Sequence, residues 1–328
     1  YSALLRCFVG KYIVKRLLSL IPVLIGVSLI VFFLVRMIPG SALQMYMGTQ
    51  VEATAEQMEE LKRLFGEDKP IPVLYFEWVG DLLKGDFGYS LRTGRPVLPD
   101  ILNRLPISLE LTLYSLILAL LIGIPLGVVS SLHQNTFGDF INRVIGLIGL
   151  SLPQFWLAAL MVIAFSNFQG WIPMGNYISL LEDPVKNLKM FFLPSLAIGF
   201  GFAAVVMRYT RNSMLEVLQM DYVRTAKAKG LPHRKVIIIH ALKNAILPVI
   251  TVTGFNAGYL LGGSIVIEEV FALPGMGRLA LYAINQRDYP VIQAIVLVIA
   301  TLFVLVNLMT DLVYALADPR IRLVDEKR

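Results

Sequence analysis

Long runs of apolar residues, separated by polar connections, dominate the pattern along the chain. A helix needs roughly 20 residues to cross a bilayer, and runs of about that length occur at residues 17–36, 108–130, 144–166, 191–208, 246–267 and 291–314. The first run is longer than the apolar region of a signal peptide and no small-residue cleavage site follows it, so we expect it to remain as a transmembrane helix. The pattern predicts an all-α polytopic membrane protein with six transmembrane helices. Because the sequence begins at Tyr1, we expect the native start to lie upstream.

The longest polar connection, residues 41–105, lies between the first two apolar runs. A capping-box pattern at residues 54–57 begins an amphipathic segment that ends near Gly66, and a second amphipathic segment runs from Val73 to Lys84. The glycine-rich run at residues 85–97 predicts turns. We expect a small external helical lid, which either stabilises the bundle or receives a partner or a substrate.

The composition supports a membrane location and excludes other classes. Hydrophobic residues make up 56% of the chain, charged residues 16%, and the mean hydropathy is +0.69, whereas soluble domains have about 45–50% apolar and about 25% charged residues. The apolar content excludes a disordered chain. A secreted disulfide scaffold is excluded because Cys7 is the single cysteine.

The basic residues are divided unequally between the two sides of the predicted membrane domain. With the N-terminus inside, 17 of the 29 Lys and Arg residues lie on the cytoplasmic side. Most of the others fall in the long external segment, which the positive-inside rule discounts. We therefore expect a multi-pass protein with both termini in the cytoplasm. This topology accounts for the net charge of +6 through contact with membrane lipid, without a nucleic-acid partner.

Residues that carry chemistry are scarce at membrane depth. The middles of the six apolar runs contain no ionisable residue, which argues against a proton-coupled or ion-coupled carrier. The three histidines are scattered, and the chain has no metalloprotease motif, no nucleophile elbow and no phosphate-binding loop. We therefore predict no catalytic, cofactor-binding or metal-ligating residues in this chain, which is not itself an enzyme.

Small residues and prolines recur in the predicted spans. Gly254, Gly258 and Gly262 lie on one helical face, which favours close helix packing over a pore lining. Prolines such as Pro153 and Pro248 give the bundle places to bend. The uncharged polar residues that remain for a translocation path are Ser151, Gln154, Asn256, Ser264 and Asn307.

The cytoplasmic loop at residues 212–245 contains a short cationic segment. Asp221 has the side chain of an N-cap, Gly230 suits the position after the last turn, and Pro232 cannot continue the helix. A helix this short is marginal in water, so it needs a surface, either a groove in a partner protein or anionic lipid headgroups. Small residues at 226 and 228 suit insertion into a groove. The segment comprises Asp221, Tyr222, Arg224, Thr225, Ala226, Lys227, Ala228, Lys229 and Gly230.

The wider segment from Asp221 to Pro248 resembles the permease signature of bacterial ABC importers. That signature reads Glu-Ala-Ala, three residues, Gly, and later Ile-x-Leu-Pro. Here the triplet is Arg224-Thr225-Ala226, Gly230 matches, and the Leu-Pro end lies farther downstream. These departures are shared with the DppB/OppB group of dipeptide, oligopeptide and nickel permeases, which the chain resembles more closely. Further blocks of the resemblance are Met37-Ile38-Pro39-Gly40, Gly85-Asp86-Phe87-Gly88, Pro274-Gly275-Met276-Gly277-Arg278, Arg287-Asp288-Tyr289-Pro290 and Asp318-Pro319-Arg320-Ile321-Arg322.

The resemblance implies the type I ABC importer permease fold and a defined set of partners. The chain would pair with a homologous second permease subunit, as a heterodimer, in the bacterial cytoplasmic (inner) membrane. Two ABC ATPase subunits would hold ATP and Mg²⁺ on the cytoplasmic side. An extracytoplasmic substrate-binding protein would deliver a dipeptide or oligopeptide. Residues 221–230 would be the coupling helix, seated in a groove of one ATPase subunit.

The expected organisation has four parts. They are a cytoplasmic N-terminus with the first transmembrane helix at 1–40, the external lid at 41–105, a permease core of five helices at 106–316 that includes the coupling loop 212–245, and a cytoplasmic tail at 317–328.

Three alternatives stay open from the sequence. The first keeps the family and changes the substrate to nickel, another metal chelate or glutathione. The second is a self-contained channel or secondary carrier, which would transport without ATP and without partner subunits. The third is a scaffold or receptor subunit, in which the basic helix is a lipid-surface element.

Overall fold

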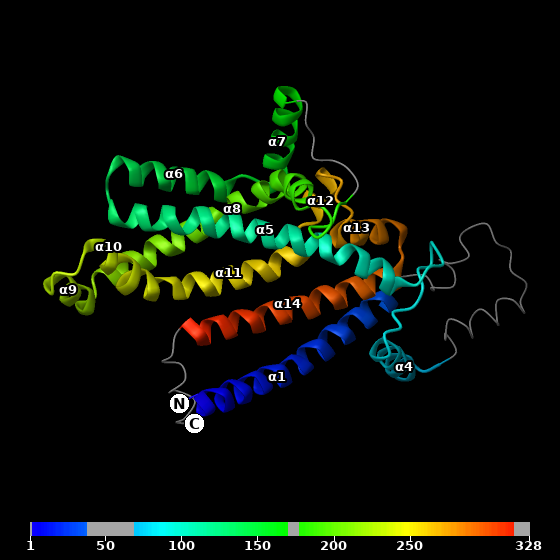
Figure 1. Cartoon of the computed structure of the whole chain (residues 1–328). Helices are drawn as coiled ribbons and strands as arrows, with labels where there is room; N and C mark the ends of the chain where they lie inside the picture. Colours follow the sequence, from blue (N-terminus) through cyan, green and yellow to red (C-terminus); the bar gives the residue numbers. More distant parts are fainter. Residues whose placement is uncertain (1, 38–68, 170–176, 318–328) are drawn as a thin grey trace, which may run out of the picture. The chain divides into compact units, whose positions relative to one another are not determined.

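The computed structural model describes residues 2–37, 69–169 and 177–317 (Figure 1). Throughout these residues the regular elements are helical, which confirms the predicted all-α class, and one isolated bridge joins Tyr89 to Pro96 in a turn. The first predicted lid helix, near residues 54–65, and most of the tail lie outside the described residues. The chain divides into two compact units, Tyr1–Pro106 with Arg278–Thr301 and Ile107–Gly277 with Leu302–Arg328.

The first unit contains the second predicted lid helix. Its elements are α1 (Ser2–Met37), α4 (Ile71–Leu83) and parts of α5 (Val97–Leu132), α13 (Met276–Gln286) and α14 (Tyr289–Ala317). The ring of Phe32 on α1 is fully buried and lies 5.3 Å from the ring of Tyr75 and 5.5 Å from that of Trp78. The hydroxyl of Ser28 lies 2.8 Å from that of Tyr75. Aromatic packing and one hydrogen bond therefore hold α4 against α1.

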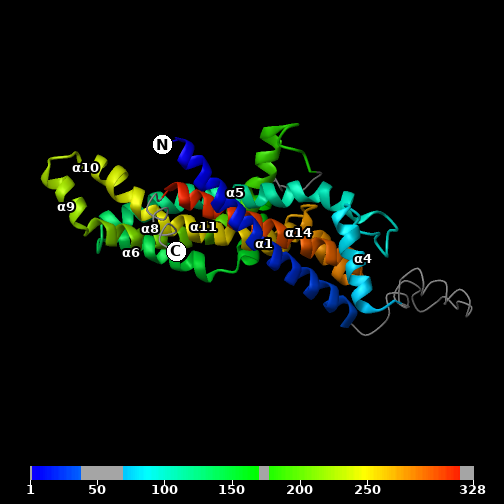
Figure 2. The ribbon, with the colours of Figure 1, turned by 90° about the horizontal axis from the view of Figure 1, so that it is seen from below.

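The second unit is built around α8 (Pro184–Leu218), whose apolar side chains make up much of the core. Leu193, Ala197 and Ile198 are completely buried on this helix. The second part of α5, α6 (Phe137–Ser151) and α11 (Lys243–Gly263) run along α8 in both views (Figures 1 and 2). This arrangement buries α8 on most sides, as expected of the central helix in a bundle.

Glycines let helices of the second unit approach closely. A Cβ atom at Gly123 of α5 would lie 2.7 Å from the backbone oxygen of Ala203 in α8. On α11, a Cβ atom at Gly254 would overlap the side chain of Thr310, and one at Gly258 would overlap a ring of α14. These contacts confirm the interpretation of the small-residue faces as packing surfaces.

Five described helices are long and apolar enough to cross a bilayer, and there are six crossings if the bent pair α6 and α7 (Gln154–Gln169) counts as one span. This pair lies where the third span is predicted, at residues 144–166. The two helices are bent by 101°, and α7 points away from α6 in Figure 1. Leu152 is extended, with ψ of 127°, because the following Pro153 disfavours the helical conformation at the residue before it. The predicted third span is therefore a helix pair broken at Pro153, one of the prolines predicted to bend the bundle.

Short helices lie at both ends of α11. α9 (Asp221–Ala228), α10 (His233–Lys235) and the π-helix η2 (Val236–Leu242) connect α8 to α11, and they lie where α8 ends and α11 begins (Figures 1 and 2). α12 (Ile265–Val270) follows the opposite end of α11. The connection between α8 and α11 contains the segment that the sequence singles out.

Candidate functional site

The predicted coupling helix is present as α9. Val223 and Ala226 form its inner face; they are 0% and 6% exposed and belong to one apolar cluster with Val236, against which Leu231 packs. Residues three apart lie on the same side of a helix, so these two positions form a single apolar stripe. α9 therefore docks on its own chain through this stripe, which leaves the rest of its surface outward.

The outer face of α9 carries the basic residues. The side chain of Arg224 is 72% exposed, and Lys227 and Lys229 are exposed as well. Ala226 is the one predicted contact residue that faces inward, so Ala228 is the small residue available to a partner's groove. The members of the predicted set that are exposed are Asp221, Tyr222, Arg224, Thr225, Lys227, Ala228, Lys229 and Gly230.

The start of α9 differs from the predicted N-cap by one residue. Met220 occupies the N-cap position, with ψ of 145° and no side-chain hydrogen bond to the first turn. Asp221 lies in that first turn, and its carboxylate is 3.5 Å from the guanidinium of Arg224. A carboxylate there is favourable beside the positive end of the helix dipole. Asp221 therefore supports the helix by charge and not by capping.

The end of α9 has the geometry that Gly230 predicts. Gly230 has φ of +75°; its N–H donates to the carbonyl of Lys227 at 3.0 Å, and the N–H of Leu231 donates to the carbonyl of Ala226 at 3.4 Å. This pair of hydrogen bonds defines a Schellman motif. A Cβ atom at residue 230 would meet nothing within 4 Å. The need for glycine therefore comes from the backbone conformation alone.

The π-helix η2 joins α9 to the long helices, and nothing in the sequence pattern predicts it. Its Val236 lies in the cluster beneath α9, whereas Ala241 lies in a second cluster with Met214 of α8. π-helical turns are rare and occur often at functional sites. The inner face of α9 is therefore connected through η2 to α8.

A hydrogen bond makes a second connection, from α9 to α11. The side-chain amide of Asn244, in the first turn of α11, donates to the hydroxyl of Tyr222 at 2.9 Å. It also lies 3.2 Å from the carbonyl of His240. α9 is therefore connected to both long helices that flank it along the chain, α8 and α11.

A buried ion pair that the sequence analysis missed lies between α6 and α8. The side chain of Asp139 on α6 is 0% exposed and that of Arg211 on α8 is 14% exposed. The Asp139 carboxylate also accepts hydrogen bonds from the hydroxyl of Ser130 and the backbone N–H of Asn135. The pattern Thr136-x-x-Asp139, in which the N–H of Asp139 donates to the Thr136 hydroxyl, marks the helix start in the sequence but does not identify the arginine.

In the first unit, a carboxylate of the Arg287-Asp288-Tyr289-Pro290 block binds the residues that follow the Gly85-Asp86-Phe87-Gly88 block. The hydroxyl of Ser90 donates to Asp288, whose carboxylate also accepts from the N–H of Leu91 at 3.1 Å. The guanidinium of Arg92 donates to the carbonyl of Gln286 at 2.7 Å. Asp288 is 2% exposed. The turn at residues 85–96 is thereby fixed to the junction of α13 and α14.

In the second unit, Glu268 of α12 is a completely buried carboxylate. Its Oε1 atom accepts hydrogen bonds from Ser108 at 2.7 Å and from Ser264 at 2.8 Å, and Ser108 accepts from the N–H of Met276 at 2.8 Å. A Cβ atom at Gly275 would lie 2.5 Å from Glu268. Ser264, predicted for the translocation path, is thus bound within this cluster. Sequence reasoning missed Glu268 because it follows the end of an apolar run.

A further polar cluster fixes the connection before α8. Tyr177 donates to one oxygen of the Glu110 carboxylate at 2.9 Å, and the amide of Asn187 donates to the other at 2.7 Å. Burial and the neighbouring Glu110 carboxylate raise the pKa of Tyr177 to about 12. Asn187 also donates to the carbonyl of Ile178 at 2.9 Å. The loop before α8 is therefore hydrogen-bonded to both α5 and α8.

The other four residues predicted for a translocation path lie on four different helices. Ser151 is exposed at the end of α6, and Gln154 is partly buried at the start of α7. Asn256 on α11 has a buried amide nitrogen without a partner, and Asn307 on α14 is partly buried. Within the described residues, no hydrogen bond joins any two of the five predicted side chains. The path stays a prediction.

No metal site is visible in the part of the chain that the structure describes, where no group of three or more His, Cys, Asp or Glu side chains is arranged to hold an ion.

Similarity to known proteins covers most of the chain. Residues 123–323 match the family described as "Binding-protein-dependent transport system inner membrane component", and residues 9–112 match the corresponding N-terminal family. The dipeptide transport system permease protein DppB of Alkalihalophilus pseudofirmus is 41% identical over 331 residues, covering 95% of this chain and 99% of that protein. The glutathione transport system permease protein GsiC of Escherichia coli K12 is 39% identical over 312 residues, with coverages of 95% and 99%.

One solved structure shares the fold. The MetNI methionine ABC transporter in an inward-facing conformation aligns with a TM-score of 0.54 at 18% identity, covering 66% of this chain and 96% of that chain. The chain belongs to the family of binding-protein-dependent transport system inner membrane components. It is a multi-pass ABC importer permease of the DppB/OppB group, which confirms the resemblance in the sequence.

Proposed function

We propose that the chain is the transmembrane permease subunit of an ATP-driven importer that carries dipeptides or oligopeptides across the bacterial cytoplasmic membrane. The observation that carries this proposal is α9, a helix of eight residues docked through one apolar stripe, with a basic outer face that the described residues leave uncovered. A second permease subunit completes the membrane part as a heterodimer. Two ATPase subunits hold ATP and Mg²⁺, and an extracytoplasmic binding protein delivers the peptide.

In this proposal α9 is the coupling helix, and both termini of the chain lie in the cytoplasm. The basic outer face of α9 sits in a groove of one ATPase subunit. When the ATPase pair closes on ATP, α9 moves with the groove. The movement reaches α8 through the cluster around Val236 and α11 through the hydrogen bond between Tyr222 and Asn244. Hydrolysis resets the inward-facing state.

Peptide is the preferred substrate because a dipeptide permease is 41% identical to this chain along nearly its full length. Glutathione, which the similar GsiC transports by its name, is itself a tripeptide and is the second candidate. The two proposals share the same machinery and differ in the peptide that the binding protein selects.

The test uses the whole complex, purified with the proteins encoded beside this chain and placed in lipid nanodiscs. ATP hydrolysis is measured with the binding protein empty, loaded with dipeptides, loaded with glutathione, and loaded with a nickel chelate. We expect dipeptides to stimulate hydrolysis most. If only the nickel chelate stimulates hydrolysis, the assignment to the permease family stands, but peptide is rejected as the substrate. If no ATPase subunit co-purifies, the assignment of α9 as a coupling helix fails.

A further inference from the structure

The first unit contains a cavity of about 670 Å³ that neither the coupling helix nor the family motifs explain. Its walls come from the end of α1, from α4, from the turn at residues 85–96 and from the first turns of α14. The hydrogen bonds of Ser90 and Leu91 to Asp288 fix two of these walls to each other. Cavities of about 300–1,000 Å³ are the usual size for small-molecule ligands. The cavity therefore has a preformed wall and room for a short peptide.

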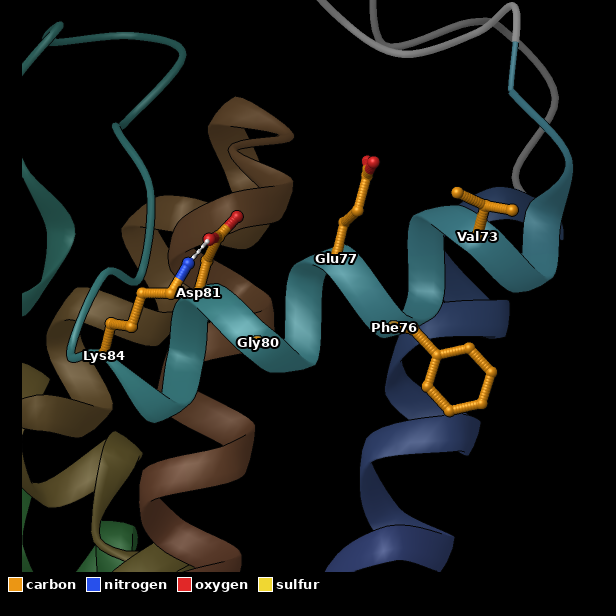
Figure 3. Close-up of a pocket in the computed structure, with 6 residues that line it drawn as sticks. All are labelled: Val73, Phe76, Glu77, Gly80, Asp81 and Lys84. Carbon is orange, nitrogen blue, oxygen red and sulfur yellow. Dashed lines mark hydrogen bonds and ion pairs between the residues drawn. The ribbon is translucent and has the colours of Figure 1, made fainter.

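The lining of this cavity carries charges of both signs. Glu77, Asp81 and Asp86 line it together with Arg36. Figure 3 shows the adjoining outer groove, in which Glu77 and Asp81 project from α4 on the side opposite to Phe76. A molecule with a positive and a negative end matches such a lining better than an ion of one sign.

Of the three carboxylates that line the cavity, that of Asp86 is available to bind a positively charged group of a ligand. Glu77 pairs with Lys69 at 2.7 Å, and Asp81 pairs with Lys84 at 3.3 Å. Asp86 accepts a hydrogen bond from the N–H of Gly88 at 2.9 Å, and within the described residues it has no basic partner. Its remaining lone pairs are therefore free for an incoming donor.

A second, independent feature of the lining also points to a ligand. Gln293 of α14 lines the cavity and is 9% exposed, and its Nε2 atom is buried without a hydrogen-bond partner. A buried polar group without a partner is costly, and buried polar groups in folded proteins are nearly always satisfied. An amide nitrogen donates, so the missing group is an acceptor such as a carbonyl oxygen.

We propose that this cavity binds the N-terminal end of a short peptide, with the ammonium at Asp86 and the first carbonyl oxygen accepting from Gln293. Arg36 then faces the C-terminal carboxylate of a dipeptide or the next carbonyl of a longer one. The inference rests on the proposed peptide transport and adds a receiving site within the permease chain itself. A metal ion fits poorly, since no three carboxylates of the described residues are arranged to hold one.

The test measures binding of Ala-Ala and of N-acetyl-Ala-Ala to the complete complex in nanodiscs, without the binding protein, by titration calorimetry. Acetylation removes the ammonium charge and keeps the carbonyl groups. We expect it to weaken binding by about tenfold or more, as for loss of a charge-assisted hydrogen bond. The same weakening is expected for Ala-Ala with Asp86→Asn, which preserves the acceptor of the turn at Gly88.

Two further variants complete the design. Gln293→Leu removes the buried donor, so it weakens both ligands several-fold. Glu182→Gln, at an exposed acid that is not part of the cavity lining, is the matched control and leaves both affinities unchanged. Asp86→Asn should leave the acetylated ligand unaffected, because that ligand has no ammonium to lose.

The outcomes separate this inference from the proposed function. If peptide-loaded binding protein stimulates ATP hydrolysis while Asp86→Asn and Gln293→Leu bind Ala-Ala like the control, the receiving site is rejected and peptide transport stands. Equal binding of the acetylated and free peptides also rejects the site. If no peptide stimulates hydrolysis with any preparation, both proposals fall.

Discussion

Arg211 of α8 binds Asp139 of α6 through two parallel hydrogen bonds, from Nε to Oδ1 at 2.9 Å and from Nη2 to Oδ2 at 3.0 Å. The pair is buried at the side of α8 that faces α6. Because α8 leads directly to α9, this bidentate contact fixes the helix that precedes the proposed coupling helix.

We predict that Arg211→Met destabilises the chain by about 3–5 kcal/mol, because the buried Asp139 carboxylate loses its bidentate partner. Arg143, half-exposed and 3.6 Å from the same carboxylate, does not replace the two lost hydrogen bonds. The double variant Asp139→Leu with Arg211→Met should be less destabilised, since it removes both charges. Thermal unfolding of the purified complex measures the difference. The control is Arg208→Met, which changes an exposed arginine of the same helix. A double variant no more stable than the single one contradicts this account of the pair.

We predict that Gly230→Val uncouples peptide transport from ATP hydrolysis. The residue has φ of +75°, a conformation that costs other L-residues about 1–2 kcal/mol. Since no atom lies within 4 Å of the added Cβ, a graded series separates backbone strain from crowding, with Asn tolerated better than Ala and Ala better than Val. The measured quantity is peptide transported per ATP hydrolysed. Normal coupling in Gly230→Val refutes the assigned role of the α9 end.

We predict that Arg224→Glu lowers the amount of ATPase that co-purifies with this chain, without lowering its thermal stability. Arg224 is on the outer face and its nearest acid, Asp221, is itself 97% exposed, so the change affects the docking surface and not the core. The comparison is Ala226→Leu, which overfills the inner cluster and should cost about 1–3 kcal/mol. If Arg224→Glu and Ala226→Leu lower the thermal stability equally, α9 does not have separate inner and outer faces.

We predict a stability contribution from Tyr177 that disappears at high pH. Burial and the Glu110 carboxylate raise its pKa from 10.0 to about 12, so the folded state favours the neutral phenol. This contribution is fully present below the unfolded pKa and is lost as the pH rises through the folded value. Unfolding of the wild type and of Tyr177→Phe, compared at pH 8 and pH 11.5, should show a difference that shrinks at the higher pH. A constant difference excludes this titration.

Local signals in the sequence predicted α9 and α4 well. Gly230 and Pro232 set the end of α9 through their backbone preferences. The amphipathic pattern from Val73 to Lys84 predicts α4 within two residues at each end. The start and end of such a helix depend on residues close to it along the chain, so they can be predicted from the sequence alone.

Features that depend on distant residues were not predictable. Asp139 and Arg211 are separated by 72 positions, and no pattern links them. The inward position of Ala226 depends on Val236, which lies beyond a turn. The 101° bend at Pro153 was predicted as a place to flex, but its size depends on how α7 packs in three dimensions. The hydrogen bond from Ser108 to Glu268 also joins residues that are far apart in the sequence, so it could not be predicted either.

The most direct test of the central claim is uptake of a labelled dipeptide by proteoliposomes containing the complete complex, with its binding protein outside and ATP inside. We predict accumulation that requires ATP, the binding protein and an intact α9, so that Arg224→Glu abolishes it. Uptake that continues without ATP and without the partner subunits would contradict the account and identify the chain as a self-contained channel or carrier.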